Sequence, residues 1–467
     1  MRTLQNVSPT SEQLAILADV RPGFRLIRGA AGSGKTTAAL LRLRQLCASR
    51  LNRRTRLGSE EPVRVLVLTF NRTLRGYVSQ LAKDKVATSD KLHLTVETFG
   101  HWALNIVGQR RLIDLRDNPR IRTLLRNVGV ADTNLDYFID EIEYILGRFP
   151  PSERVQYTSA LRSGRGRAPA VPREMRIRLL TDVLEPYEAG KSREGYADWN
   201  DIALDTAATP GEGYDVVVVD ESQDLSANQI RAVLSHLRED HVTTFIIDAM
   251  QRIYPQSFQW QELGIEMRSQ MVFALTRNHR NTKEIARFAS SLVRDLPAEE
   301  DGVLPDVEAC ERTGPRPQVV AGTYRAQLRY MLDRIQPFLD ADETVAILQP
   351  KGGGWLNYTR QMLQQRNIVY CELTRNPDWP TGSELVALST IHSAKGLEFD
   401  HVLLPGLNQE VTPHGDEDGD GTLDSLRRLV AMGIGRARRT VMVGYKPGEQ
   451  STLIGLIDPA TYDSLEV

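Results

Sequence analysis

The stretch from Gly29 to Thr36 constrains the fold of this chain more than any other, because it fits the pattern G-x-x-x-x-G-K-[ST]. The short segment Phe24–Ile27 before it is predicted to be a strand, and a helix is predicted to start at Thr37. Glycines in such a loop let backbone N–H groups surround a phosphate, and the helix N-terminus adds positive potential. We therefore predict a nucleoside triphosphate site formed by Gly29, Ala30, Ala31, Gly32, Ser33, Gly34, Lys35, Thr36 and Thr37.

Side chains with the chemistry of triphosphate hydrolysis stand in two places. Lys35 can reach the β- and γ-phosphates as a point charge, and the Thr36 hydroxyl can ligate Mg²⁺. Farther along, Asp220 and Glu221 follow a run of four valines in the predicted strand Tyr214–Val219. We expect Asp220 to hold Mg²⁺ and Glu221 to orient and deprotonate the attacking water.

The composition narrows the class of protein. The 467 residues suffice for several domains, and 41% hydrophobic with 25% charged residues is ordinary for a globular protein. The formal net charge of −2 gives no global basic field, although a local basic face can still bind nucleic acid. The sequence contains no run of about 18 apolar residues, so no membrane span is predicted. Three widely spaced cysteines are typical of reduced thiols, so a cytoplasmic location is expected: Cys47, Cys310 and Cys371.

Two further predicted strands, Val63–Thr69 and Leu92–Val96, end in hydroxyl and aromatic side chains. Open α/β sheets hold ligands at the carboxyl ends of their strands. Hydroxyls suit phosphate contacts, and rings suit base stacking. Core packing is an equal alternative for both phenylalanines. The candidate nucleic-acid contacts are Thr69, Phe70, Asn71, Thr98, Phe99 and His101.

Polar and aromatic side chains also follow the predicted strands Thr243–Ile247 and Met271–Leu275. Gln251 can sense a γ-phosphate through its amide, and Arg280 can reach a triphosphate from the other side. Tyr254 and Trp260 are candidates for base stacking, although each also suits a core position.

The rest of the chain divides into a helical and an α/β part. Residues 109–197 are predicted to be mostly helical and locally basic, which suits either a solvated surface or contact with a polyanion. After the Pro/Gly-rich residues 313–317, a second α/β unit is predicted. Its expected strands are Gln318–Val320, Val345–Leu348, Leu385–Leu388 and His401–Leu404.

These blocks, in this order, resemble superfamily 1 helicases of the UvrD/PcrA/Rep kind. The segment Thr390–Phe399 is similar to the family's T-x-H-x-A-K-G-L-E-F block almost throughout, and it includes His392, a further candidate nucleic-acid contact. The resemblance implies ATP as the nucleotide. It also implies γ-phosphate contacts for Gln251 and Arg280, a ribose contact for Glu398, and an arginine finger at Arg436.

The resemblance also gives Gln13 the role of reading adenine, whereas on its own this residue is typical of a surface glutamine. Two positions depart from the family pattern, since His279 replaces a Tyr and Gly435 replaces a Thr. The interval from Arg280 to Thr390 is too short for the family's second accessory insertion. A compact form is therefore expected.

The predicted fold class is α/β, with two RecA-like P-loop NTPase lobes that have parallel sheets and a mostly helical insertion in the first lobe. The expected parts are the first lobe at 1–108 and 201–272, the insertion at 109–200, and the second lobe at 273–467.

The predicted function is an ATP-dependent DNA helicase or translocase that uses Mg²⁺ and moves on single-stranded DNA. The 3′–5′ direction comes from the resemblance alone. The expected partner is single-stranded or tailed duplex DNA. No association with a membrane is expected. The alternative is an ATP-gated, nucleic-acid-binding regulatory module or nuclease partner that hydrolyses ATP without processive unwinding. A nuclease or a repair or defence protein is a further candidate partner. An RNA-directed motor stays open, because no feature reads the 2′-hydroxyl.

Overall fold

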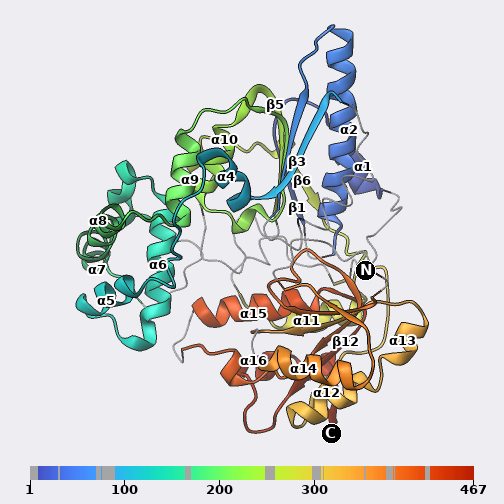
Figure 1. Cartoon of the computed structure of the whole chain (residues 1–467). Helices are drawn as coiled ribbons and strands as arrows, with labels where there is room; N and C mark the ends of the chain where they lie inside the picture. Colours follow the sequence, from blue (N-terminus) through green and yellow to red (C-terminus); the bar gives the residue numbers. More distant parts are fainter. Residues whose placement is uncertain are drawn as a thin grey trace.

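Two parallel β-sheets, each covered by helices, form the two halves of the protein in the computed structural model (Figure 1). The structure describes residues 9–29, 32–69, 75, 90–162, 170–247, 258–296, 307–308, 310–351, 354–374, 382, 384–415 and 421–467. This arrangement is the two-lobe, RecA-like α/β fold that the sequence predicts. None of the helices in these ranges is long and apolar enough to cross a membrane.

The first sheet has six strands in the order β3-β2-β4-β5-β1-β6, and all of their pairings are parallel. The apolar runs predicted as strands are its members, because a parallel sheet buries both of its faces. Val216 and Val218 of β4 face one core cluster, whereas Val217 and Val219 face another. The strands are β1 (Gly23–Gly29), β2 (Val63–Thr69), β3 (Leu92–Thr98), β4 (Tyr214–Val219), β5 (Leu237–Ile247) and β6 (Val272–Leu275).

Helices cover both faces of this sheet. One core cluster joins the sheet to α1 and α2, and the other joins it to α4, α9 and α10. β6 pairs with β1, so the first sheet includes the strand that begins at the lobe boundary proposed at residue 272. The helices are α1 (Ser11–Ala18), α2 (Lys35–Arg56), α4 (Phe99–Val107), α9 (Trp199–Ala208) and α10 (Ala227–Leu234).

Between α4 and β4 the chain forms a helical block with a hydrophobic core of its own (Figure 1, left). Many of its arginines form ion pairs inside the block, which favours the solvated-surface alternative over contact with a polyanion. Examples are Arg116–Asp140, Arg120–Glu194, Arg122–Asp136 and Arg126–Asp132. The α-helices of the block are α5 (Pro119–Asn127), α6 (Leu135–Arg148), α7 (Arg173–Arg178) and α8 (Glu185–Glu194).

The second sheet has seven strands in the order β13-β7-β12-β11-β8-β10-β9, again all parallel. The four predicted strands are present, and three more were not predicted: β9, β12 and β13. The strands are β7 (Gln318–Ala321), β8 (Val345–Gln349), β9 (Tyr370–Glu372), β10 (Val386–Thr390), β11 (Phe399–Leu404), β12 (Ala437–Tyr445) and β13 (Asp463–Glu466).

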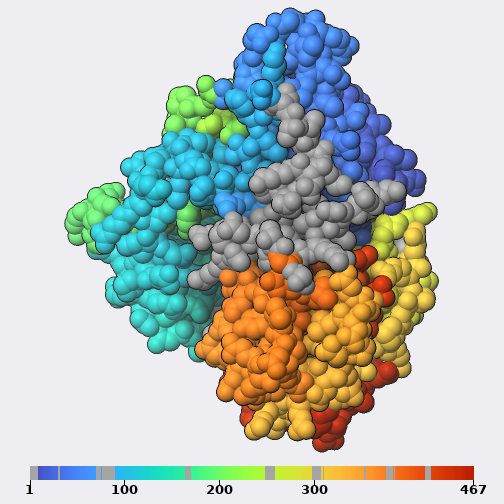
Figure 2. All heavy atoms as spheres, turned by 45° about the vertical axis from the view of Figure 1, so that its right-hand side comes forward, coloured from blue at the N-terminus to red at the C-terminus, as the bar shows by residue number. Residues whose placement is uncertain are grey.

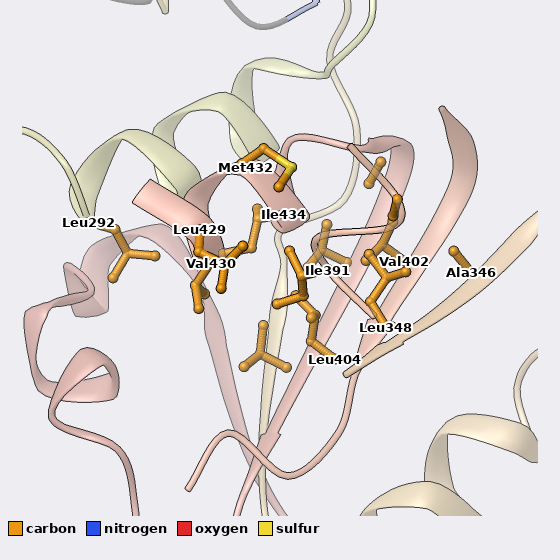
Figure 3. Close-up of a cluster of buried hydrophobic side chains, with 14 of the residues drawn as sticks. Leu292, Ala346, Leu348, Ile391, Val402, Leu404, Leu429, Val430, Met432 and Ile434 are labelled. Atoms are coloured by element: carbon orange, nitrogen blue, oxygen red, sulfur yellow. The ribbon is translucent and has the colours of Figure 1, made fainter. Parts of the chain in front are cut away.

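α15 (Gly421–Ile434) contributes to one of the core clusters of the second lobe. Figure 3 shows Leu429, Val430 and Ile434 of this helix turned toward Val402 and Leu404 of β11. Figure 2 shows this lobe, in orange and red, below the blue first lobe. The other α-helices of the second lobe are α11 (Lys283–Ser291), α12 (Tyr324–Leu332), α13 (Gln336–Asp340), α14 (Gly354–Gln365) and α16 (Thr452–Leu456).

Candidate nucleotide site and nucleic-acid interface

The phosphate loop follows β1 and accommodates only glycine at three described positions. A Cβ on Gly29 would lie 2.6 Å from the carbonyl oxygen of Leu275, and one on Gly32 would lie 2.2 Å from Asn278 Oδ1. Gly34 has a φ of +77°, and a Cβ there would lie 2.7 Å from Gln13 Nε2. Since Gly32 also has a positive φ of +81°, the loop needs both the small size and the backbone freedom of glycine.

The side chains of the loop converge with the end of β4. Thr36, in the first turn of α2, donates from its hydroxyl to Asp220 Oδ2 at 2.9 Å. Lys35 Nζ lies 2.7 Å from the carbonyl oxygen of Gly29 and donates to it. The Ser33 hydroxyl is buried and has no hydrogen-bond partner among the described residues, so the cradle holds a polar group that suits a phosphate.

The two carboxylates at the end of β4 are in different electrostatic environments. Burial, reinforced by the charge of Glu221, raises the pKa of Asp220 to about 7. Burial also opposes ionisation of Glu221, but the charges of Lys395, Arg436 and Lys35 outweigh it, so the pKa of Glu221 is lowered. Glu221 therefore stays a carboxylate beside a neighbour that gains a proton more easily.

The backbone also constrains Glu221. Its φ of +52° lies in the left-handed region, which is uncommon for a residue with a side chain. Gln223 Nε2 donates to Glu221 Oε2 at 2.6 Å, and Asp220 Oδ1 accepts from the Glu221 backbone N at 2.9 Å. Such a conformation persists only where its surroundings hold it, and it fixes the direction of the Glu221 carboxylate.

The second lobe brings a lysine to these carboxylates. Lys395, which lies between β10 and β11, donates to Asp224 Oδ2, and its Nζ lies 3.6 Å from Glu221 Oε2. The sequence interpretation assigned no role to Lys395, Asp224 or Gln223. Gln223 holds Glu221 from within the first lobe, whereas the contact between Lys395 and Asp224 joins the two lobes, and no local sequence pattern shows a contact between lobes.

Two arginines predicted to contact the triphosphate lie at the start and near the end of the second lobe. Arg280 Nη2 pairs with Glu398, and Arg280 Nε is buried without a partner among the described residues. Arg436 is buried between α15 and β12, where its Nε donates to the carbonyl of Met432 at 3.2 Å. Burial opposes ionisation of Glu398, but the Arg280 charge outweighs it and lowers the pKa of Glu398.

Gln13 is buried beside the phosphate loop, so the surface alternative for this residue is wrong. Its side chain is 3% exposed. Its Oε1 accepts from the backbone N of Thr10 at 3.0 Å, and its Nε2 donates to the carbonyl of Gly34 at 3.4 Å. The amide that the resemblance assigns to adenine thus also joins α1 to the loop.

The candidate nucleic-acid contacts fall into two groups. Phe99 and Trp260 pack in the core of the first lobe, at 4% and 9% exposed. The structure therefore gives both rings the core role that was the alternative to base stacking. Thr98 caps α4 by accepting from the backbone N of His101 at 3.4 Å, and the half-exposed ring of His101 pairs with Glu97 at 2.8 Å.

Thr69 is buried at the end of β2. His392 is half-buried, and burial together with the charge of Lys395 lowers its pKa to about 4. The ring is therefore neutral at pH 7. Six predicted site residues lie outside the described part of the chain: Ala30, Ala31, Phe70, Asn71, Gln251 and Tyr254.

Mg²⁺ fits the meeting point of Thr36 and Asp220, because a hydroxyl and a carboxylate oxygen stand together there and such hard oxygens suit this ion. Among the residues with described positions, no group of three or more His, Cys, Asp or Glu side chains could hold a metal on its own.

Two family profiles match this chain. The family described as an AAA domain matches residues 12–257, more than half of the chain, and the family described as a UvrD-like helicase C-terminal domain matches residues 360–447. The chain belongs to the superfamily 1 helicases of the UvrD/Rep kind. The phosphate loop and the Asp220–Glu221 pair lie in the first match, and Lys395, Glu398 and Arg436 lie in the second.

Individual relatives agree with this membership. DNA helicase IV of Escherichia coli is 22% identical over 434 residues, which cover 82% of this chain and 58% of that protein. DNA helicase II of Rickettsia typhi is 44% identical over 61 residues, or 12% of this chain and 9% of that protein. ATP-dependent DNA helicase Rep of Escherichia coli is 39% identical over 54 residues, or 12% and 8%. The chain thus covers less than two thirds of the length of each of these relatives.

Proposed function

We propose that this chain is an ATP-dependent motor that moves along single-stranded DNA and separates DNA strands. The observation that carries the proposal is the convergence of three elements on one point. Thr36 of the phosphate loop meets Asp220 at 2.9 Å, and Lys395 of the other lobe approaches the adjacent Glu221 at 3.6 Å. A nucleotide bound there would contact both lobes, so its hydrolysis would change how they fit together.

The chemistry is divided between the lobes. Lys35 would bind the β- and γ-phosphates, and Glu221 would take a proton from the attacking water. Arg280 and Arg436 would neutralise charge on the transferring phosphoryl group from the second lobe, with Gln251 sensing the γ-phosphate. Thr36 and Asp220 would hold Mg²⁺, which neutralises phosphate charge when it is bound.

Adenine and ribose would be held at the edge of the same site. Gln13 would bind the adenine edge after exchanging its present partners, and Glu398 would bind the ribose after releasing Arg280. The Arg280–Glu398 pair supports this exchange of partners, because a triphosphate is a stronger partner for Arg280 than a single carboxylate is.

Single-stranded DNA would cross the carboxyl ends of both sheets, where such folds bind ligands. The remaining candidates for this path are Thr69, Phe70, Asn71, Thr98, His101, Tyr254 and His392. The 3′–5′ direction is proposed from the family resemblance.

The test is ATP hydrolysis by the purified chain with and without single-stranded DNA, beside a Lys35→Ala control. We expect DNA to stimulate hydrolysis strongly and the control to abolish it. Strand separation is then compared on duplexes with a 3′ or a 5′ tail, and only the 3′ tail should support it. A rate of hydrolysis that does not change when DNA is added would contradict the proposal and favour an ATP-gated regulatory module. Stimulation by RNA alone would contradict the choice of DNA.

A further inference from the structure

Helix α1 contacts two parts of the candidate nucleotide site that lie far apart in the sequence. Gln13 reaches the carbonyl of Gly34 in the phosphate loop. Glu12, the preceding residue, accepts two hydrogen bonds from Thr276, one from the hydroxyl to Oε1 at 2.8 Å and one from the backbone N to Oε2 at 3.2 Å. Thr276 is the first residue after β6, where the chain leaves the first sheet.

The segment that begins at Thr276 lies against the phosphate loop and ends at Arg280. The backbone N of His279 donates to the carbonyl of Gly32 at 3.2 Å. Asn278 Oδ1 accepts from the backbone N of Arg280 at 3.0 Å, which holds Arg280 in a tight turn. The position of Thr276 therefore influences where the Arg280 side chain stands relative to the phosphates.

The other end of α1 is fixed to the sheet. Arg42 of α2 is fully buried and donates from Nη1 to the carbonyls of Ile16, at 2.6 Å, and Asp19 at the end of α1. Arg42 Nε also donates to the hydroxyl of Thr244 on β5 at 3.2 Å. Because this end of α1 is anchored, we expect a shift of its N-terminal end to move the residues that this end contacts, and not to displace the whole helix.

We infer that Glu12 is a positioning residue that couples recognition of adenine by α1 to the placement of Arg280. The inference rests on the proposed ATP site. An adenine bound to Gln13 fixes the start of α1, and Glu12 then holds Thr276 and the following segment where Arg280 meets the γ-phosphate. A base that Gln13 does not bind leaves this connection loose. Discrimination between nucleotides is then expressed in kcat as well as in KM, because the connection acts on the transition state.

The experiment compares kcat and KM for ATP and UTP, with saturating single-stranded DNA, in the full chain and its variants. Glu12→Ala removes two hydrogen bonds to a charged group, so we expect kcat for ATP to fall about ten-fold. We expect kcat for UTP to change much less, so that the ATP/UTP ratio of kcat falls. Glu12→Gln keeps an accepting oxygen and should retain most of the ratio.

Thr276 provides matched variants that leave α1 intact. Thr276→Val removes only the hydroxyl and should lower the ATP/UTP ratio by less than Glu12→Ala does, whereas Thr276→Ser should match the unaltered protein. An unchanged ratio in both Glu12→Ala and Thr276→Val, or an equal loss of kcat with both nucleotides, would overturn the coupling alone. An unaltered protein that hydrolyses ATP no faster than Lys35→Ala would overturn the proposed function, and the coupling with it.

Discussion

Lys395 of the second lobe donates to Asp224 of the first, and both side chains are fully buried. The same ammonium group stands 3.6 Å from Glu221 Oε2. A buried charge without a partner is costly, so this pair favours lobe positions in which the two residues meet. The contact thus joins the proposed catalytic carboxylate to the lobe that carries Arg436.

Replacing Lys395 by Met should shift the pH dependence of hydrolysis. Lys395 lowers the pKa of Glu221, so removing its charge raises that pKa and keeps Glu221 protonated to a higher pH. The acid limb of the kcat/KM profile should therefore move to higher pH. Lys446→Met, which removes an exposed lysine paired with Glu449, is the control and should leave the profile in place. If the acid limb stayed in place in Lys395→Met, Lys395 would not control the protonation of the catalytic carboxylate.

Glu221→Gln should abolish turnover but preserve ATP binding. The amide is similar in size and can still hydrogen-bond with Gln223, but it cannot accept a proton from water. We expect kcat to fall by about 100-fold or more. Nucleotide binding is measured by titration with a fluorescent ATP analogue, and Glu61→Gln at an exposed ion pair serves as the control. Substantial residual hydrolysis would mean that Glu221 is not the base.

Arg436→Ala should lower kcat far more than it lowers affinity for ATP. An arginine that neutralises the transition state contributes about 1,000-fold or more to kcat. Arg439→Ala is a close control, because Arg439 lies three residues downstream on β12 and forms an outer ion pair with Glu343. Since Arg436 is buried, melting temperatures are compared first. Equal kcat values for the two variants would mean that Arg436 does not reach the phosphates.

Much of the fold was predictable because parallel strands buried on both faces are continuous apolar runs. β2 and β4 show this pattern clearly, and the phosphate loop and the Asp220–Glu221 pair follow directly from such strands. β13 was missed because Asp463–Glu466 is short, polar and mostly exposed. β12 was missed because two charged residues, Arg438 and Arg439, follow its first residue and interrupt the apolar pattern.

The site was predictable where one residue type has one chemistry, and less so where a side chain suits two environments. Phe99 and Trp260 have rings that suit a base or a core equally well, and only the packing of α4 and the residues after β5 places them inside. Lys395 and Asp224 stand 171 positions apart, so their contact depends on how the lobes meet. The resemblance assigned Gln13 the role of reading adenine, while its burial follows from the folded position of α1.

Glu143 of the helical block should make the stability of the protein depend on pH. Burial, reinforced by the charge of Asp198, raises the pKa of Glu143 to about 7, above its ordinary value of 4.5. The folded protein therefore binds a proton more tightly than the unfolded chain between these two values. The free energy of unfolding should fall as pH rises through this window and should level off above it.

Glu143→Gln removes this proton exchange while keeping an oxygen that can accept from Asn200 Nδ2, which lies 3.1 Å from Glu143 Oε1. The variant should be more stable than the unaltered protein at pH 8, and the difference should shrink toward pH 5 because Glu143 is then protonated. Thermal unfolding at both pH values measures this. Glu174→Gln, on α7 of the same block, is the control. A stability difference that is the same at pH 5 and pH 8 would mean that Glu143 does not titrate in this window.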